Sequence, residues 1–170
     1  MKLNYLSKRA LRELVVILRE RFNLTNEYEK IVLAELSSGE KHVRFYIGIG
    51  EVEKIPLAIE IEELIIPALH ALNKNIMSIP YVRIDSGAVS RILNGADVMA
   101  PGITECTSFE RDSIVGVREP ERNLFISVGI ALMSCDEIKS LKKGKAVRNL
   151  HYAGDKIWRE LLEILKRISA

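Results

Sequence analysis

The first periodic segment of the chain predicts an amphipathic helix over residues 7–22. Its apolar residues recur at the spacing of one helix face: Leu11, Leu14, Val15 and Leu18. Ser7 stands just before this pattern, where a hydroxyl side chain can cap the N-terminus of a helix. The other face is basic and carries Lys8, Arg9, Arg12 and Arg19.

The remainder of the first half predicts a small sheet followed by a second helix. Segments rich in β-branched and aromatic residues predict strands at 29–36, 41–50 and 54–63. Residues 37–40, SSGE, predict a hairpin turn between the first two strands. Residues 65–75 predict a helix with Pro67 in its first turn, where the missing N–H of proline costs nothing.

Near Pro80 the pattern changes to extended chain and predicts a boundary between two domains, residues 1–79 and residues 80–170. Beyond it, strands are predicted at 81–85, 97–104, 112–119, 123–132 and 146–154. Residues 134–145 open with a capping-box pattern that predicts a helix and end in a basic, glycine-closed turn. A last helix is predicted over 155–169, with its first four residues, DKIW, either helical or extended. Strands separated by so few helices indicate a small, partly closed β-barrel, so the expected fold class is α+β.

Three glycines punctuate the segment RIDSGAVSRILNGADVMAPGI, residues 83–103. Asp85 or Ser86 can cap a short helix here, and Gly95 stands where helices often end in the left-handed region. The apolar residues of this helix share one face: Val89, Ile92 and Leu93. Three polar residues are left facing outward: Ser90, Arg91 and Asn94.

Composition and charge are those of an ordinary folded protein. Of the 170 residues, 48% are hydrophobic and 28% are charged. No apolar run approaches the roughly 20 residues of a membrane span, so we expect a cytoplasmic protein with no membrane partner. The net charge of +2 is no nucleic-acid signature, so any such site must depend on a local patch. Glutamine is absent while Glu, Lys, Arg and Ile are plentiful, which is typical of proteins from hot environments.

No motif in the sequence indicates catalysis, a metal or a cofactor. Cys106 and Cys135 form no CxxC pair, so we expect two unpaired thiols and neither a disulfide framework nor a zinc site. His42 and His70 have no second ligand nearby in the sequence. There is no Ser/His/Asp order, phosphate-binding loop or dinucleotide fingerprint, so we expect a protein that is not an enzyme.

Two separated motifs resemble one known domain. RIDSGAVSRILNGADVMAPGI resembles the opening of the PUA domain, named for pseudouridine synthases and archaeosine transglycosylases. KKGKAVRNLHYAGDKIW resembles its closing part in the archaeal and eukaryotic group similar to the malignant T-cell-amplified sequence protein. In that group the domain follows a small α/β pre-PUA domain, as residues 1–79 would here. The extension RELLEILKRIS is absent from the eukaryotic relatives; it would shield the last strand or dock on the first domain.

The resemblance implies a six-stranded pseudobarrel that binds RNA with its short helix, the following loop and its last strand. Carried onto this sequence, it selects Gly87, Ser90, Arg91, Asn94, Gly95, Met99, Ala100, Pro101, His151, Tyr152 and Lys156. Glycines would admit the RNA backbone, Arg91 would hold phosphate in a forked contact, and Tyr152 would stack on an unpaired base. Asn94 and His151 would offer hydrogen bonds to base edges or 2′-hydroxyls.

Several of these residues, and some of their neighbours, also have a plainer interpretation. Gly87, Gly95 and Gly102 are adequately explained as turn residues. An exposed arginine on a helix is usually only solvated, and Trp158 lies on an apolar period typical of packing. The cations of the LKKGK run would form a phosphate patch or a solvated turn: Lys142, Lys143 and Lys145, with Arg148 nearby. The basic face of the helix at 7–22 would extend an RNA surface or simply face solvent.

The leading hypothesis is therefore a protein that binds structured RNA, tRNA or rRNA, in translation or at the ribosome. The ribosome and an initiation-factor-like protein are the further partners that the resemblance implies. Two alternatives stay open: a protein-interaction module with little RNA affinity, which the near-neutral charge favours, and an accessory subunit of an RNA-modification enzyme.

Overall fold

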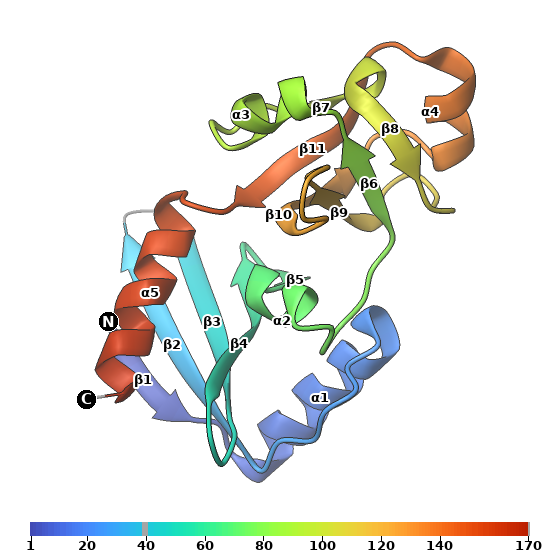
Figure 1. The fold of residues 1–170 in the computed structure, drawn as a ribbon. Coiled ribbons are helices and arrows are strands. Elements are labelled where there is room, and N and C mark those ends of the chain that lie inside the picture. The colour runs from blue at the N-terminus through green and yellow to red at the C-terminus, as the bar shows by residue number, and fades with distance from the viewer. Residues whose placement is uncertain (39–40, 170) are drawn as a thin grey trace. The chain divides into compact units, whose positions relative to one another are not determined.

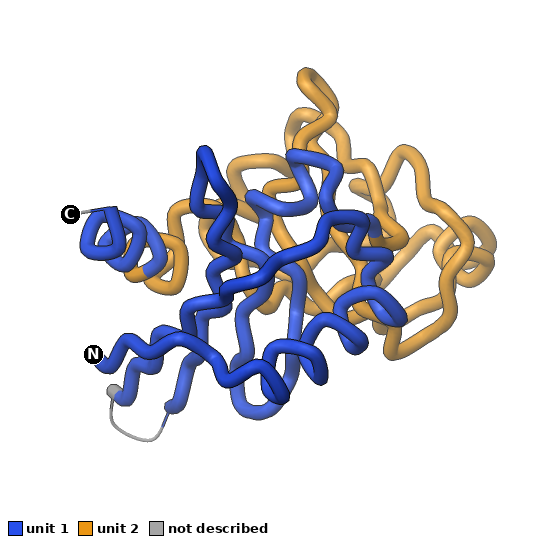
Figure 2. Tube along the Cα trace, turned by 90° about the horizontal axis from the view of Figure 1, so that it is seen from below, with its two compact units in different colours: residues 1–78, 161–170 blue, residues 79–160 orange. Residues whose placement is uncertain are grey.

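The computed structural model describes residues 1–38 and 41–169, and the chain divides into two compact units (Figure 2). Unit 1 comprises Met1–Ser78 and Leu161–Ala170, and unit 2 comprises Ile79–Glu160. The predicted hairpin turn at 37–40 falls partly on Gly39 and Glu40, which lie outside the described residues. No helix in the described part of the chain is both long enough and apolar enough to cross a membrane.

Unit 1 is a five-stranded antiparallel sheet with two helices of its own (Figure 1). Its elements are β1 (Lys2–Tyr5), α1 (Lys8–Phe22), β2 (Lys30–Ser38), β3 (Lys41–Ile49), β4 (Lys54–Ile61), β5 (Leu64–Pro67) and α2 (Leu69–Asn73). The strands lie side by side in chain order, β1 to β5. From β2 to β5 each strand pairs with the next as soon as the chain turns back, whereas α1 lies between β1 and β2.

The helix predicted at 7–22 is confirmed as α1. The hydroxyl of Ser7 accepts a hydrogen bond from the N–H of Ala10 at 3.1 Å and caps the helix. Asn23 ends it in the left-handed region, with φ at 56°. The helix buries one apolar face against unit 1: Leu14, Val15, Leu18 and Phe22.

Two features of unit 1 differ from the sequence prediction. The residues predicted as one helix, 65–75, are the strand β5 followed by the shorter helix α2. Pro67 ends the strand and does not open a helix. Glu62 and Glu63 both have positive φ and turn the chain tightly back from β4 to β5. Because such turns usually carry asparagine or glycine, two glutamates gave no signal of a hairpin. The exposed strand β1 was also not predicted.

The C-terminal extension belongs mostly to unit 1. Helix α5 (Lys156–Ser169) begins in unit 2, and its residues from Leu161 onward are part of unit 1. Leu161 and Ile164 are fully buried. The ammonium of Lys54 donates a hydrogen bond to the carbonyl of Ile168 at 2.6 Å. The extension therefore docks on the first unit, one of the two roles expected for it.

Unit 2 is a six-stranded, barrel-like sheet, which confirms the expected α+β fold (Figure 1). Its strands are β6 (Tyr81–Ile84), β7 (Val98–Met99), β8 (Ile103–Cys106), β9 (Ile114–Arg118), β10 (Phe125–Ala131) and β11 (Lys145–Tyr152). They lie in the order β7-β11-β10-β9-β6-β8. Strands β7 and β8 stand at opposite ends of this order, yet only Ala100–Gly102, the 3₁₀ helix η2, separates them. So short a connection forces the sheet to curl and brings its two ends close together.

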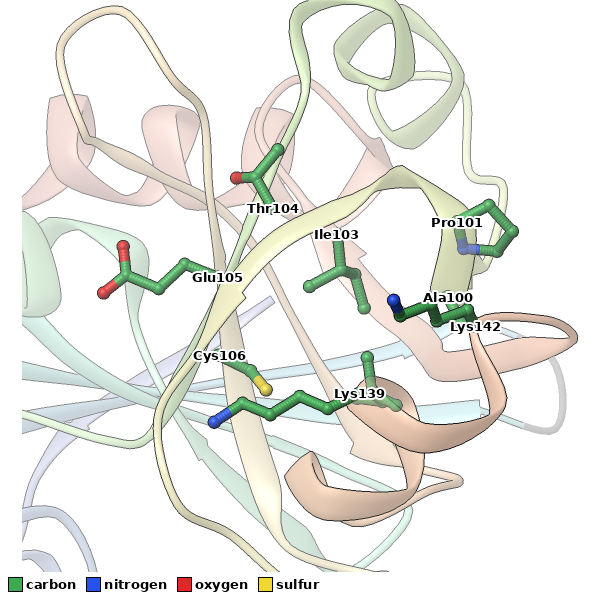
Figure 3. A pocket seen from close by; sticks show the side chains of 9 residues that line it. Ala100, Pro101, Ile103, Thr104, Glu105, Cys106, Lys139 and Lys142 are labelled. Atoms are coloured by element: carbon green, nitrogen blue, oxygen red, sulfur yellow. The ribbon is translucent and has the colours of Figure 1, made fainter.

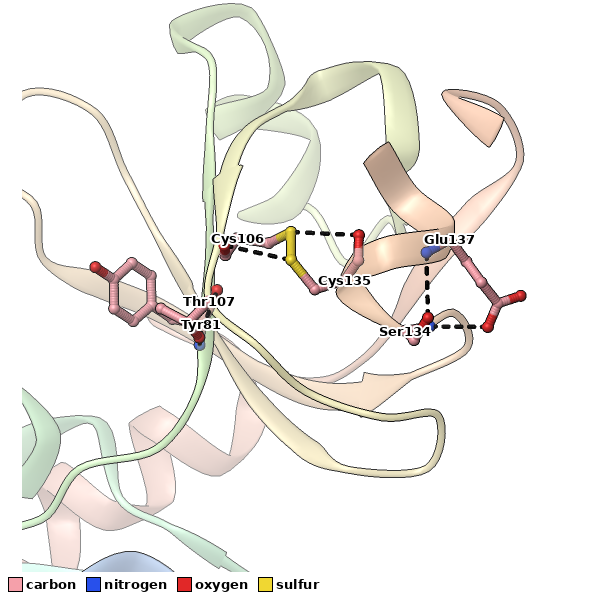
Figure 4. Close-up of a disulfide and its surroundings, with 6 residues drawn as sticks. All are labelled: Tyr81, Cys106, Thr107, Ser134, Cys135 and Glu137. Carbon is pink, nitrogen blue, oxygen red and sulfur yellow. Dashed lines mark hydrogen bonds between the residues drawn. A yellow bond between two sulfur atoms is a disulfide. The ribbon is translucent and has the colours of Figure 1, made fainter. Parts of the chain in front are cut away.

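Short helices connect the strands of unit 2. The 3₁₀ helix η1 (Ser86–Ala88) and α3 (Val89–Ile92) follow β6, and α4 (Cys135–Leu141) precedes β11. The capping box at the start of α4 is confirmed, with Ser134 and Glu137 each accepting the other's backbone N–H (Figure 4). The single strand predicted at 97–104 is wrong: it is split into β7 and β8 by η2, because Pro101 has no N–H for a strand ladder.

A disulfide joins Cys106 to Cys135, so the prediction of two unpaired thiols is wrong (Figure 4). The Cα atoms lie 5.9 Å apart although the two residues are 29 positions apart in the sequence. The bond ties the end of β8 to the first residue of α4. No spacing motif marks such a pair, since only the closure of the barrel brings these two elements together.

Candidate nucleic-acid interface

The segment between β6 and β7 is shaped by caps that its own sequence supplies. The carboxylate of Asp85 accepts a hydrogen bond from the N–H of Ala88 at 2.9 Å and starts η1. Ile92 is buried, and Gly95 ends the helix with φ at 93°. Ser90, Arg91 and Asn94 are exposed. The amide of Asn94 donates back to the carbonyl of Ser90 at 2.7 Å, so its donor is satisfied within the helix.

Asn149 fixes this helix to the last strand of the barrel. Its side-chain amide donates to the carbonyls of Ile92 and Ala96 at 3.1 and 3.0 Å. Its side-chain oxygen accepts from the hydroxyl of Ser127 at 2.8 Å, and its backbone N–H donates to Asp97 at 3.0 Å. The bonds to Ile92, Ala96 and Asp97 each span more than fifty residues of sequence, so they set where α3 lies relative to β11.

One cavity lies between α3 and the segment Met99–Gly102, with a volume of about 390 Å³. Its lining includes Asp85, Gly87, Arg91, Asp97, Met99 and Pro101. Arg91 forms no ion pair with any described residue, which leaves its guanidinium available. A side chain at Gly87 would meet only the carboxylate of Asp85, at 3.5 Å, so the backbone is open there. The carboxylates of Asp85 and Asp97 can accept hydrogen bonds from hydroxyl or amino groups, and the guanidinium of Arg91 can bind phosphate.

A second cavity, of about 420 Å³, lies on the other side of the same segment (Figure 3). Ala100, Pro101 and strand β8 line one wall, and Lys139 and Lys142 reach in from the side of α4. In Figure 3, Lys139 extends toward Cys106, a lining residue that the disulfide joins to the first residue of α4. Neither lysine forms an ion pair within the described chain. Pro101 lines both cavities, and we call the segment Met99–Gly102 between them the ridge.

The turn from α4 into β11 holds the other predicted lysines. Lys142 and Gly144 both have positive φ, which reverses the chain tightly. Lys143 is exposed, and Lys145 lies 3.4 Å from the carboxylate of Asp97 in an ion pair. Lys145 is also the register partner of Met99, so this basic turn lies next to the ridge.

Tyr152, His151 and Lys156 occupy three different environments. Tyr152 is half-buried against Gly95, where an added Cβ would approach its ring to 3.3 Å. His151 is buried, and its Nδ1 lies 2.8 Å from the carboxylate of Asp155. Lys156 is exposed at the start of α5 and lies 3.9 Å from Glu160. His151 is thus placed to orient Asp155, whereas Tyr152 stands beside the end of α3.

Asp155 connects the last strand to α5. Burial by itself raises the pKa of its carboxyl, but His151 and the N–H groups of Trp158 and Tyr152 outweigh it, so the pKa lies below its ordinary value. Its two oxygens accept from the N–H of Trp158 at 2.7 Å and of Tyr152 at 3.1 Å. A charged Asp155 therefore caps α5 and holds Tyr152 in place.

The structure brings half of the predicted RNA-binding residues around the ridge and leaves the others apart. Around the ridge lie Gly87, Arg91, Met99, Ala100, Pro101, Lys142 and Lys145. Ser90, Asn94, Gly95 and Tyr152 lie on α3 or beside its end, while His151 is buried and Lys156 lies on α5. Sequence reasoning missed Lys139, Asn149 and Asp97. Lys139 shares the lysine-rich segment with Lys142, a signal that could have found it, whereas nothing local marks the other two.

Comparison with known proteins identifies the domain. A family model of the PUA domain matches residues 80–153. An uncharacterised protein of Methanocaldococcus jannaschii is 44% identical over 108 residues, which span 63% of this chain and 67% of that protein. Translation machinery-associated protein 20 of Saccharomyces cerevisiae is 30% identical over 131 residues, 73% of this chain and 70% of the yeast protein. Human malignant T-cell-amplified sequence 2 is 32% identical over 96 residues, and the match spans only 53% of that protein.

A solved structure extends the likeness to nearly the whole chain. A hypothetical protein of Pyrococcus horikoshii superposes with a TM-score of 0.77 at 31% identity. The match covers 94% of this chain and 99% of that chain. The resemblance stated from the two sequence motifs is confirmed, and the similarity includes the elements of unit 1.

Proposed function

Because this chain belongs to the PUA-domain proteins, in the group that includes translation machinery-associated protein 20, we propose that unit 2 binds structured RNA, either tRNA or rRNA. The observation that carries this proposal is the ridge Met99–Gly102, which has a cavity on each side and three cations without acidic partners around it. Those cations are Arg91, Lys139 and Lys142.

The two cavities suit different parts of a nucleotide. Lys139 and Lys142 supply positive charge with no carboxylate paired to them, which favours a phosphate. On the other side, Asp85 and Asp97 lie near Arg91, so the same cavity offers acceptors for a 2′-hydroxyl or an exocyclic amine and a fork for phosphate. Recognition of a 2′-hydroxyl is what distinguishes RNA from DNA at a given site. The half-exposed ring of Tyr152 adds a surface for stacking beside Gly95.

The role that fits this site is a cytoplasmic one in translation or at the ribosome. The support is the relationship to translation machinery-associated protein 20 and to the malignant T-cell-amplified sequence proteins. In this role the ribosome supplies the RNA surface, and an initiation-factor-like protein is the further partner that we propose. The protein acts by binding and not by catalysis.

The test is a titration of labelled tRNA, single-stranded RNA and duplex DNA by fluorescence anisotropy at several salt concentrations. We expect structured RNA to bind best, Arg91→Glu to weaken it strongly, and Lys142→Ala to lower the log–log salt slope by about 1. Arg122→Glu is the matched control, because Arg122 is an exposed arginine on the turn between β9 and β10 of the same unit.

Two results would oppose the proposal. If Arg91→Glu and Arg122→Glu weaken binding equally, the effect is general electrostatics and the ridge is not the site. If the wild type binds RNA no better than DNA and ignores salt, unit 2 is a protein-interaction module, the alternative that the net charge of +2 favours.

A further inference from the structure

A third cavity lies in unit 1, outside the segment that the PUA family model matches. Its volume is about 520 Å³. The first turns of α1 form one side, and the residues leading into β2 form the other. The lining consists of Lys8, Leu11, Arg12, Tyr28, Glu29 and Lys30.

The three cations of this cavity are not neutralised by the protein. Within the described residues, Lys8, Arg12 and Lys30 form no ion pair with an acidic side chain, although Glu29 lies in the same lining. The Nε of Arg12 donates only to the carbonyl of Lys8, at 3.3 Å. Arg9, one position from Lys8, does pair with Glu13 at 3.2 Å and points to a different neighbour. Positive charge is therefore concentrated at the cavity.

The position of these cations opposes what helix stability alone favours. The N-terminus of a helix carries partial positive charge, so acidic residues stabilise the first turn and basic residues destabilise it. Helix α1 has no acidic residue in its first turn and begins instead with Lys8 and Arg9. Solubility would be served equally well by acidic residues. A surface that binds an anion accounts for the choice of basic ones.

Aromatic rings lie next to these cations. Tyr5, on the edge strand β1, is 64% exposed, and the ammonium of Lys30 lies 5.8 Å from its ring centroid. Tyr28 lines the cavity, and its ring rests against Gly48, where an added Cβ would come within 2.7 Å of it. The ring of Tyr28 is thus held in place. Exposed or fixed rings beside unpaired cations are the elements with which proteins bind single-stranded nucleic acid.

We propose that this cavity, with Tyr5 at its rim, is a second RNA-contact site that binds a short unpaired segment. Phosphates contact Lys8, Arg12 and Lys30, while one base stacks on the ring of Tyr5 or against Tyr28. The site depends on contacts within unit 1 alone, so it does not depend on the interface proposed for unit 2. It gives the first unit a function of its own in binding RNA.

The experiment titrates the full-length protein with labelled oligouridine, which has no secondary structure, across a range of salt. The variant Lys8→Ala/Arg12→Ala/Lys30→Ala should weaken binding at least tenfold and reduce the salt slope by about 2, since each phosphate contact to a single strand contributes about 0.7. Tyr5→Ala should weaken binding with an unchanged salt slope, because stacking releases no counterion. Tyr5 is an exposed edge residue, so this change leaves the fold intact.

Arg21→Ala is the matched control, because Arg21 is an exposed cation in the last turn of the same helix and does not line the cavity. Arg91→Glu and the triple variant together separate this site from that of unit 2, since Arg91→Glu should weaken structured RNA more than oligouridine, and the triple variant should weaken oligouridine more than structured RNA. The proposal is overturned if the triple variant, folded by circular dichroism, binds oligouridine as the wild type does. It is equally overturned if Arg21→Ala reduces the affinity for oligouridine and the salt slope as much as the single variant Arg12→Ala does.

Discussion

Replacing Asn149 with alanine removes the side chain that ties the end of α3 to β11. Three side-chain hydrogen bonds disappear, to the carbonyls of Ile92 and Ala96 and from the hydroxyl of Ser127. At about 1 kcal/mol of net stabilisation for each bond, the free energy of unfolding should fall by about 3 kcal/mol. That loss corresponds to roughly a hundredfold change in the unfolding equilibrium of the barrel.

Guanidinium chloride unfolding followed by circular dichroism measures this loss. Asn94→Ala is the control, because Asn94 is also an asparagine of unit 2 but forms one exposed bond, to Ser90. It should cost less than about 1 kcal/mol. Asn149→Asp should be more destabilising than Asn149→Ala, since a carboxylate would face two carbonyl oxygens and the nearby carboxylate of Asp97.

The same substitution should reduce RNA affinity at temperatures where the protein stays folded. Arg91 lies one position before Ile92, so releasing the end of α3 lets the guanidinium move away from the ridge. If Asn149→Ala is no less stable than Asn94→Ala, the bonds to α3 do not hold it in solution. If stability falls but affinity for structured RNA does not, the position of α3 is irrelevant to binding.

Three further substitutions test other features of unit 2. Cys135→Ser opens a loop of 29 residues and should lower the free energy of unfolding by about 3 to 4 kcal/mol in a denaturant titration. If the variant is as stable as the oxidised wild type, the disulfide does not stabilise the fold. Hydrogen bonds from Arg111 lower the pKa of Glu137 from 4.5 to about 2, so this pair stabilises the fold above pH 4.5 and loses its effect as the pH falls toward 2. The stability of Glu137→Gln should therefore fall less steeply with acid than that of the wild type over this range. Parallel stability curves for the two proteins would refute the assignment. Gly129→Ala places a Cβ in overlap with the backbone carbonyl oxygen of Arg148, so the strands must separate. The variant should lose about 3 kcal/mol in thermal or chemical unfolding. Wild-type stability would show that β10 and β11 can shift apart freely.

Elements governed by residues within about four positions of one another were predictable. The cap of α1 by Ser7, the cap by Asp85 and the left-handed Gly95 each depend on one short stretch of chain. The same is true of the capping box of α4. The glycine-bounded segment and the closing motif also identified the PUA domain, because a domain's characteristic turns are local features.

Features that depend on distant residues were not predictable. The pairing of Cys106 with Cys135 needs the barrel to close, and the bonds from Asn149 to Ile92 and Ala96 need the end of α3 to lie against β11. The pattern at β5 predicts a helix as readily as a strand, because Ile65 and Ile66 are apolar in either structure. Only pairing with β4 across a two-residue turn distinguishes the two outcomes.

The sequence by itself determined the helices with strong periodicity, their caps, the glycine turns and the family of the second unit. Tertiary structure alone decided that Arg91, Lys139 and Lys142 surround one ridge, and that Lys8, Arg12 and Lys30 share a cavity in the first unit. The physical reason is the range of the interactions. Caps and amphipathic faces are set by neighbours along the chain, whereas a binding surface is made where strand pairing and bonds such as those of Asn149 bring separate segments together.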